Sequence, residues 1–103
     1  MDISVPELRM STVLHVDVSN DTLRVTLSDG RALAVPSGWY PRLAHAKASE
    51  LDDWMVIDGG AGIHWPQLDE DISLSGLLTG TPSQESQQSL RRWLAMRTVV
   101  APT

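Results

Sequence analysis

The feature that most constrains the fold is the alternation of apolar and polar residues in two early runs, residues 13–18 and 23–27. In each run the apolar residues share one face of an extended chain: Leu14, Val16 and Val18 in the first, and Leu23, Val25 and Leu27 in the second. Such alternation with β-branched residues is typical of half-buried strands. Asp29-Gly30 then predicts a hairpin, because both central residues of the favoured turn have positive φ. We therefore expect a three-stranded antiparallel meander that ends at Pro36.

The chain changes character after Pro36 and predicts short helices followed by a second, smaller β element. Pro41 suits the first turn of a short helix, which the residues at 43–48 support, and a second turn of helix is expected at residues 49–52. Residues 54–57 and 63–65 are predicted strands joined by a glycine-rich turn, and residues 73–78 form a brief helix or turn. The expected fold class is α+β: an N-terminal antiparallel β-meander packed with short helices and a small second hairpin, plus a C-terminal helical tail.

The last part of the chain is predicted to be a polar linker and an amphipathic helix. Helical spacing relates four residues of this segment: Leu90, Trp93, Leu94 and Arg97. Because the last of them is charged, the apolar stripe is narrow. A short helix of this kind is marginal in water and needs a docking surface, either on its own chain or on a second copy. We therefore divide the chain into a domain at residues 1–80 and a tail at residues 81–103, and we expect that a homodimer can form.

Composition narrows the classes of function. The 103 residues include no cysteine, which removes thiol catalysis and thiolate metal sites, and the length suits one domain. The formal net charge is −5, and three of the eight basic residues are arginines of the tail, so the rest of the chain is strongly acidic. Nucleic acid is therefore not the expected partner. No secretory signal or membrane-spanning run is present in this sequence, so we expect a cytoplasmic protein.

Four ordered blocks of this sequence resemble one small bacterial family, the domain of unknown function 2442. The blocks are residues 29–31, 39–43, 62–72 and 76–78. The resemblance covers roughly residues 10 to 80, and residues 89–94 are similar to an extension that many members carry. One departure is Lys47-Ala48, where members more often have Thr-Pro at the start of a short helix.

The resemblance implies a small α+β domain and suggests a class of partner. Members of this family are often encoded beside a small toxin-like protein, so the resemblance implies an antitoxin-like role. It carries no catalytic residues over to this chain. The inference about function rests on association alone.

One cluster has the character of a metal site: His64 with Asp69, Glu70 and Asp71. In an extended chain Asp69 and Asp71 point the same way, and His64 could join them around Mg²⁺, Mn²⁺ or Zn²⁺. The other interpretation is that Asp69 and Asp71 cap the turn before residues 74–78, while His64 fills a strand position. The spacing matches no specific metal motif, so we expect the capping role and no cofactor.

The aromatic residues divide between core and surface. Because the chain has no phenylalanine, Trp39, Trp54 and Trp65 are candidates for bulky core residues. Trp93 on the tail is the better candidate for an interface, and Trp39 with Tyr40 is expected to be partly exposed. The predicted partner-binding residues are Trp39, Tyr40, Arg42, Arg91, Arg92 and Trp93.

These observations leave three functional hypotheses. The leading one is a non-catalytic, antitoxin-like protein-interaction module whose acidic body binds a small basic partner such as a toxin. The alternative is a DNA-binding transcriptional regulator that uses Arg91, Arg92 and Arg97 on phosphates. The third is a metal-dependent enzyme built on His64, Asp69 and Asp71.

Overall fold

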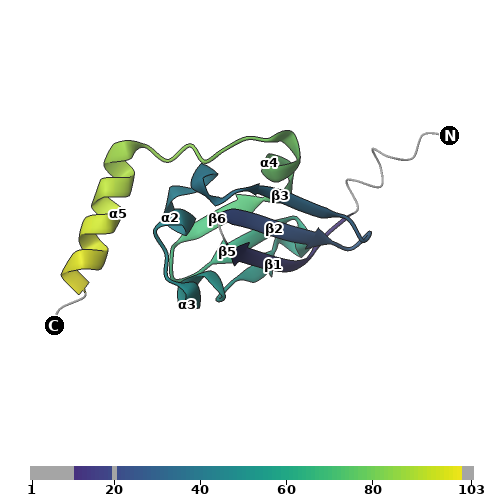
Figure 1. Ribbon diagram of the computed structural model, residues 1–103, viewed down its shortest axis with the longest axis horizontal. Coiled ribbons are helices and arrows are strands. Elements are labelled where there is room, and N and C mark those ends of the chain that lie inside the picture. The colour runs from purple at the N-terminus through teal and green to yellow at the C-terminus, as the bar shows by residue number, and fades with distance from the viewer. Residues whose placement is uncertain (1–10, 20, 101–103) are drawn as a thin grey trace.

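The computed structural model describes residues 11–19 and 21–100, and the side chains of residues 98–100 fall outside this description. The first three strands are β1 (Val13–Ser19), β2 (Thr22–Leu27) and β3 (Ala32–Pro36). They form an antiparallel sheet in the order β1-β2-β3 (Figure 1). The predicted meander is confirmed.

A β-bulge breaks the alternation at the start of β1. The pairing with β2 shifts register between Val13 and His15, so Leu14 is an extra residue without a partner across the ladder. Val13 takes the buried position, and Leu14 is 59% exposed. The prediction that Leu14 shares the core face with Val16 is therefore wrong, because one inserted residue reverses which side chains point inward.

The hairpin between β2 and β3 is present, but its turn differs from the prediction. Gly30 has a φ of 93°, whereas Asp29 is not among the described residues with positive φ. The Gly30 amide donates to the Leu27 carbonyl at 3.0 Å, and the Leu27 amide donates to the Arg31 carbonyl at 2.8 Å. This is a three-residue loop in which a tight turn is followed by a left-handed glycine.

The second sheet contains one strand more than the expected hairpin. It consists of β4 (Met55–Ile57), β5 (Gly62–Trp65) and β6 (Glu70–Ser73), all antiparallel. Acidic residues are poor strand formers, which is why the start of β6 read as a turn. The strand forms because Ile72 is buried in the core and pairs with Ile63 of β5.

A short 3-10 helix, η2 (Asp58–Gly60), joins β4 to β5 and passes close to the start of the meander. Gly60 has a φ of 102°, and a Cβ atom built there would lie 2.4 Å from the Cβ of Thr12. No other residue type fits this approach without moving the chain.

Short helices complete the body of the molecule. After η1 (Ser37–Trp39), the first short helix begins at Pro41 as expected and forms α2 (Pro41–Ala44), and the second turn of helix expected at residues 49–52 forms α3 (Ala48–Leu51). Lys47 is the N-cap of α3, so the helix begins here even though the chain lacks the Thr-Pro pair of the family. The next helix, α4 (Leu74–Thr79), ends at the left-handed Gly80.

The two sheets enclose the core between them. Buried residues from both sheets form a single apolar cluster that includes the fully buried Trp65, while Trp39 and Trp54 are half-buried against it. Helix α4 contacts both β3 and β6 and so covers that side of the sandwich (Figure 1). On the opposite side lie β1 and β4, connected by an edge-to-face contact between the rings of His15 and Trp54 with centroids 5.5 Å apart.

The tail forms α5 (Gln87–Val100), which confirms the predicted helix. It stands at one end of the molecule, beyond α2 and α3, and follows a linker without regular structure (Figure 1). Among the helices of the described residues, none combines the length and the apolar character that crossing a membrane requires.

Candidate partner-binding surface

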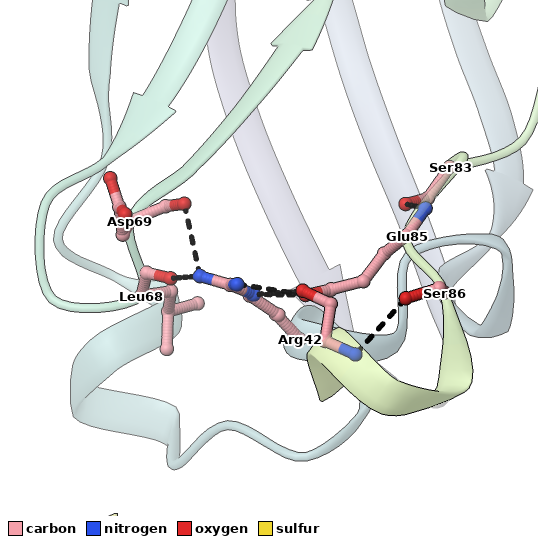
Figure 2. A network of polar contacts seen from close by, with 7 residues as sticks. Arg42, Leu68, Asp69, Ser83, Glu85 and Ser86 are labelled. Carbon is pink, nitrogen blue, oxygen red and sulfur yellow. Dashed lines mark hydrogen bonds and ion pairs between the residues drawn. The ribbon is translucent and has the colours of Figure 1, made fainter. Parts of the chain in front are cut away.

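Arg42 of α2 connects the body to the linker (Figure 2). Its guanidinium donates to both carboxylate oxygens of Glu85, with Nη2 at 2.7 Å from Oε2 and Nε at 3.1 Å from Oε1. Nη1 donates to the main-chain oxygen of Leu68 at 2.9 Å, in the turn between β5 and β6. These hydrogen bonds raise the pKa of Arg42 and lower that of Glu85, so both groups remain charged.

Trp93 anchors α5 to the body from between two arginines. The guanidinium carbon of Arg42 lies 5.1 Å from the centroid of the Trp93 ring, and that of Arg97 lies 4.5 Å from it. Arg97 also donates two hydrogen bonds to Glu50 of α3, at 2.7 and 2.9 Å. These contacts hold the tail on its own chain, and Trp93 is only 8% exposed.

The structure separates the residues predicted to bind a partner into buried and exposed groups. Tyr40 is 4% exposed and Trp93 is nearly as buried, so neither is available for direct contact while α5 is docked. Trp39 is half-buried, and Arg42 is engaged by Glu85. Arg91 and Arg92 are exposed and form no ion pair with any residue that the structure describes.

A groove of about 1070 Å³ lies between α5 and the body. Among its lining residues, Arg42, Trp93, Glu50 and Arg97 are those that dock α5, and Arg92 and Met96 extend it along the exposed side of the helix. The groove is therefore the margin of the tail-docking contact, and two of its charged groups, Glu50 and Arg97, are paired with each other.

Glu70 is a further residue of interest, and the sequence pattern predicts no separate role for it. Burial and, to a smaller extent, the nearby charge of Glu85 together raise the pKa of Glu70 to about 7 against the opposing effect of Arg42. The neighbouring hydroxyl of Tyr40 is buried and has no hydrogen-bond partner in the described part of the chain. The feature that identifies Glu70 is its cross-strand pairing with the buried Trp65, because this pairing places the Glu70 carboxyl on the inner face of β6.

The structure brings two of the three candidate metal ligands together. His64 and Asp71 are cross-strand partners on β5 and β6, and His64 Nδ1 contacts Asp71 Oδ1. Asp69 lies in the preceding turn with a φ of 52°. No group of three or more potential ligand side chains is found among residues 11–19 and 21–100. The hydroxyl of Ser73 caps α4 by accepting from the Gly76 amide, and the capping of the preceding turn by Asp69 and Asp71 stays a prediction.

Most exposed carboxylates of the described body pair with no Lys or Arg. Three arginines are neutralised internally, in the pairs Arg31–Asp29, Arg42–Glu85 and Arg97–Glu50. The exposed carboxylates that pair with no Lys or Arg of the described residues are Asp17, Asp21, Asp52, Asp53, Asp58, Asp69 and Asp71. The internal pairs thus concentrate uncompensated negative charge on the strands and turns.

Comparisons with known proteins extend this description. A family model described as "Protein of unknown function (DUF2442)" matches residues 13–83, which include both sheets and end before α5 begins. A search of curated proteins found no match.

Two solved structures share the fold. The crystal structure of a protein of unknown function from Rhodospirillum rubrum ATCC 11170 is 28% identical, covers 75% of this chain and 95% of its own, and has a TM-score of 0.63. The solution NMR structure of an uncharacterized protein from Chromobacterium violaceum is 22% identical, covers 96% of this chain and 87% of its own, and has a TM-score of 0.64.

Proposed function

This chain belongs to the family of proteins of unknown function DUF2442, and within that family we propose that it is a non-catalytic, cytoplasmic module that binds a small basic protein. In an antitoxin-like role, the partner is a small toxin whose basic surface the module covers. Neither the family description nor the descriptions of the similar structures names a reaction. The proposal therefore rests on the surface of the molecule.

The distribution of charge is the observation that carries the proposal. The chain has a formal net charge of −5, and its internal ion pairs leave seven exposed aspartates without a Lys or Arg partner among the described residues. Uncompensated charge of one sign steers an oppositely charged partner toward the surface and disfavours partners of like charge. A basic protein is the class of partner that fits this surface.

The two other hypotheses find less support. Arg97, one of three arginines suggested for DNA binding, is engaged by Glu50, which leaves Arg91 and Arg92 free for phosphates. Two phosphate contacts supply little of the counterion release on which DNA affinity depends. For a metal enzyme, the described residues bring His64 and Asp71 together without a third ligand.

Affinity capture from the native host tests the proposal. The tagged wild-type chain should retain a small basic protein at low salt and lose it at high salt, because surface charges are screened. Changing the seven exposed aspartates to asparagine should weaken retention by roughly a hundredfold if each charge contributes about 0.4 kcal/mol. Asparagine tolerates the positive φ found at three of these positions, Asp21, Asp58 and Asp69.

The matched control removes charge of the opposite sign. A variant with Arg91→Gln and Arg92→Gln should retain the partner at least as well as the wild type. The proposal is refuted if the wild type captures no small basic protein at low salt, or if the asparagine variant retains it unchanged.

The antitoxin-like role has its own test. Production of the captured partner alone should slow the growth of the host, and production of this chain with it should restore growth. Unchanged growth with the partner alone would remove the toxin interpretation and leave the binding role in place.

A further inference from the structure

We propose that the basic partner docks on the side of the sandwich formed by β1 and β4. We call this surface the open edge and define it by Leu14, His15, Trp54, Met55 and Val56. The inference rests on the proposed function and specifies where the partner binds and by which chemistry. The partner would place an apolar side chain on the open edge, surrounded by its own Lys and Arg residues.

No helix or further strand of the described residues is seen to pair with or cover the outer strands β1 and β4. β1 and β4 are outer strands of their sheets, and neither pairs with a further strand among residues 11–19 and 21–100. Helix α4 contacts the outer strands of the opposite side, β3 and β6. The contact between His15 of β1 and Trp54, the residue before β4, places these two outer strands next to each other on this side.

The open edge holds most of the large apolar side chains that the described residues expose. Leu14 is 59% exposed, Met55 49% and Val56 40%; the two other cases, Leu78 and Met96, lie on separate helices. Leu14 is turned outward by the bulge in β1, and bulges frequently serve to re-aim a side chain. Exposed apolar side chains gathered on one side of a small protein are typical of a protein-binding surface.

Aspartates border the open edge and determine the charge of the partner. Asp52 and Asp53 precede β4, Asp58 follows it, and Asp17 lies on β1. The basic residue on this side is Arg24, the cross-strand neighbour of Asp17. An apolar centre with a charged rim is the usual composition of a specific interface, and the rim selects a partner of opposite charge.

The same features exclude two other occupants. A second copy of this chain would bring identical aspartates together, which costs free energy. A strand added to the sheet is disfavoured because β4 has only three residues and β1 is bulged, and both properties protect edges from strand pairing. The remaining occupant is a folded basic surface that binds through side chains.

An NMR titration with a defined probe tests the site. The probe is a synthetic helical peptide with Leu along one face and Lys on both sides of it, and the control peptide has Glu in place of Lys. The Lys peptide should shift the amide signals of residues 13–17 and 54–58 and the indole signal of Trp54, and the Glu peptide should shift none of them. Shifts confined to α5, equal shifts with both peptides, or no shifts would overturn the proposal.

Substitutions of exposed residues provide the matched comparison. Leu14→Lys and Met55→Lys each remove an apolar contact and add a repulsive charge, and we expect each to weaken binding of the Lys peptide at least tenfold. Met96→Lys makes the same change on α5, and its affinity should equal that of the wild type. Equal weakening by all three variants would overturn the site, because only a general charge effect would then remain.

The same variants separate failure of the site from failure of the function. If Leu14→Lys still captures the small basic protein from the native host as the wild type does, the open edge is not the docking site and the proposed function stands. If the wild type captures no such protein, both proposals fail. Signals of the open edge that shift with protein concentration alone would assign the surface to a second copy and overturn the proposal.

Discussion

Replacing Trp93 by alanine should release α5 from the body while both sheets stay folded. Trp93 is the one buried residue of α5 among the side chains that the structure describes, and it is the group that both Arg42 and Arg97 contact. The other contacts of the tail are the half-buried side chains of Leu90 and Leu94, which pack against the core, and polar contacts such as the Arg97–Glu50 pair. The variant therefore removes the largest apolar contact of the docking and leaves the smaller apolar contacts and the polar part.

The size of the effect follows from the buried area. A tryptophan buries about 200 Å² of side chain, which at about 25 cal/mol per Å² corresponds to about 5 kcal/mol as an upper estimate. The remaining Arg97–Glu50 pair contributes only about 1 kcal/mol, since pairs near the surface are weak. An extended-chain reference overstates the buried area by up to about 40%, which reduces the upper estimate to about 3 kcal/mol. We therefore expect the free energy of opening of α5 to fall by about 3 kcal/mol, which is roughly 150-fold in an opening equilibrium.

Amide hydrogen exchange and circular dichroism measure this outcome. The amides of α5 should exchange roughly 150-fold faster in Trp93→Ala, and those of β2 and β5 should exchange as in the wild type. Helical signal should also fall, because a released helix of 14 residues is marginal in water. Met96→Ala on the exposed side of the same helix is the control and should leave exchange unchanged.

Two results would refute this reasoning. Unchanged exchange of α5 in Trp93→Ala would mean that the ion pairs and the half-buried Leu90 and Leu94 hold the tail without Trp93. An equal loss of protection in the sheets and in α5 would mean that the tail and the body unfold as one unit.

The remaining predictions concern ion pairing, pH and backbone geometry. In a double-mutant cycle, Glu50→Gln and Arg97→Gln should each ease the opening of α5, with a coupling energy of about 1 kcal/mol measured by hydrogen exchange; a coupling of zero would show that the pair contributes nothing. Because burial raises the pKa of Glu70 from 4.5 to about 7, the folded state holds a proton that the unfolded state releases, so this group's contribution to stability falls as pH rises from about 4.5 to 7. Glu70→Gln should flatten that decline in urea unfolding at a series of pH values, and an unchanged decline would assign it to other groups. Gly60→Ala should cost about 3 kcal/mol in the same unfolding assay, whereas Gly30→Ala, which also has positive φ but open space around it, should cost about 1 kcal/mol. Equal costs would contradict the close approach at Gly60.

The sequence alone predicts the strands whose pattern is local. Residues 22–27 alternate without interruption, and β2 forms where that alternation predicts it. The bulge at Leu14 is not predictable in this way, because it is a property of the pairing between two strands and not of either one. The consequence for function is direct, since Leu14 moves from the expected core to the open edge.

The candidate site was less predictable because its contacts are distant in the sequence. Trp93 has the sequence character of an interface residue, and it becomes buried only because Arg42 and Arg97 flank it and Glu50 holds Arg97. The position of Glu70 similarly depends on β6, whose acidic start resembles a turn. Long-range ion pairs and strand register decide these positions, and neither leaves a local pattern.

The linker gives the tail its local concentration. A short tether keeps α5 near its docking site at an effective concentration in the millimolar range, so modest contacts suffice to hold it. Thr81, Pro82 and Gln84 are exposed, and a protease that cut the chain there would dilute α5 to the concentration of the protein itself. One broken peptide bond would then let the helix dissociate. Glu50 would lose its ion pair with Arg97, and Arg42 of α2 would become exposed.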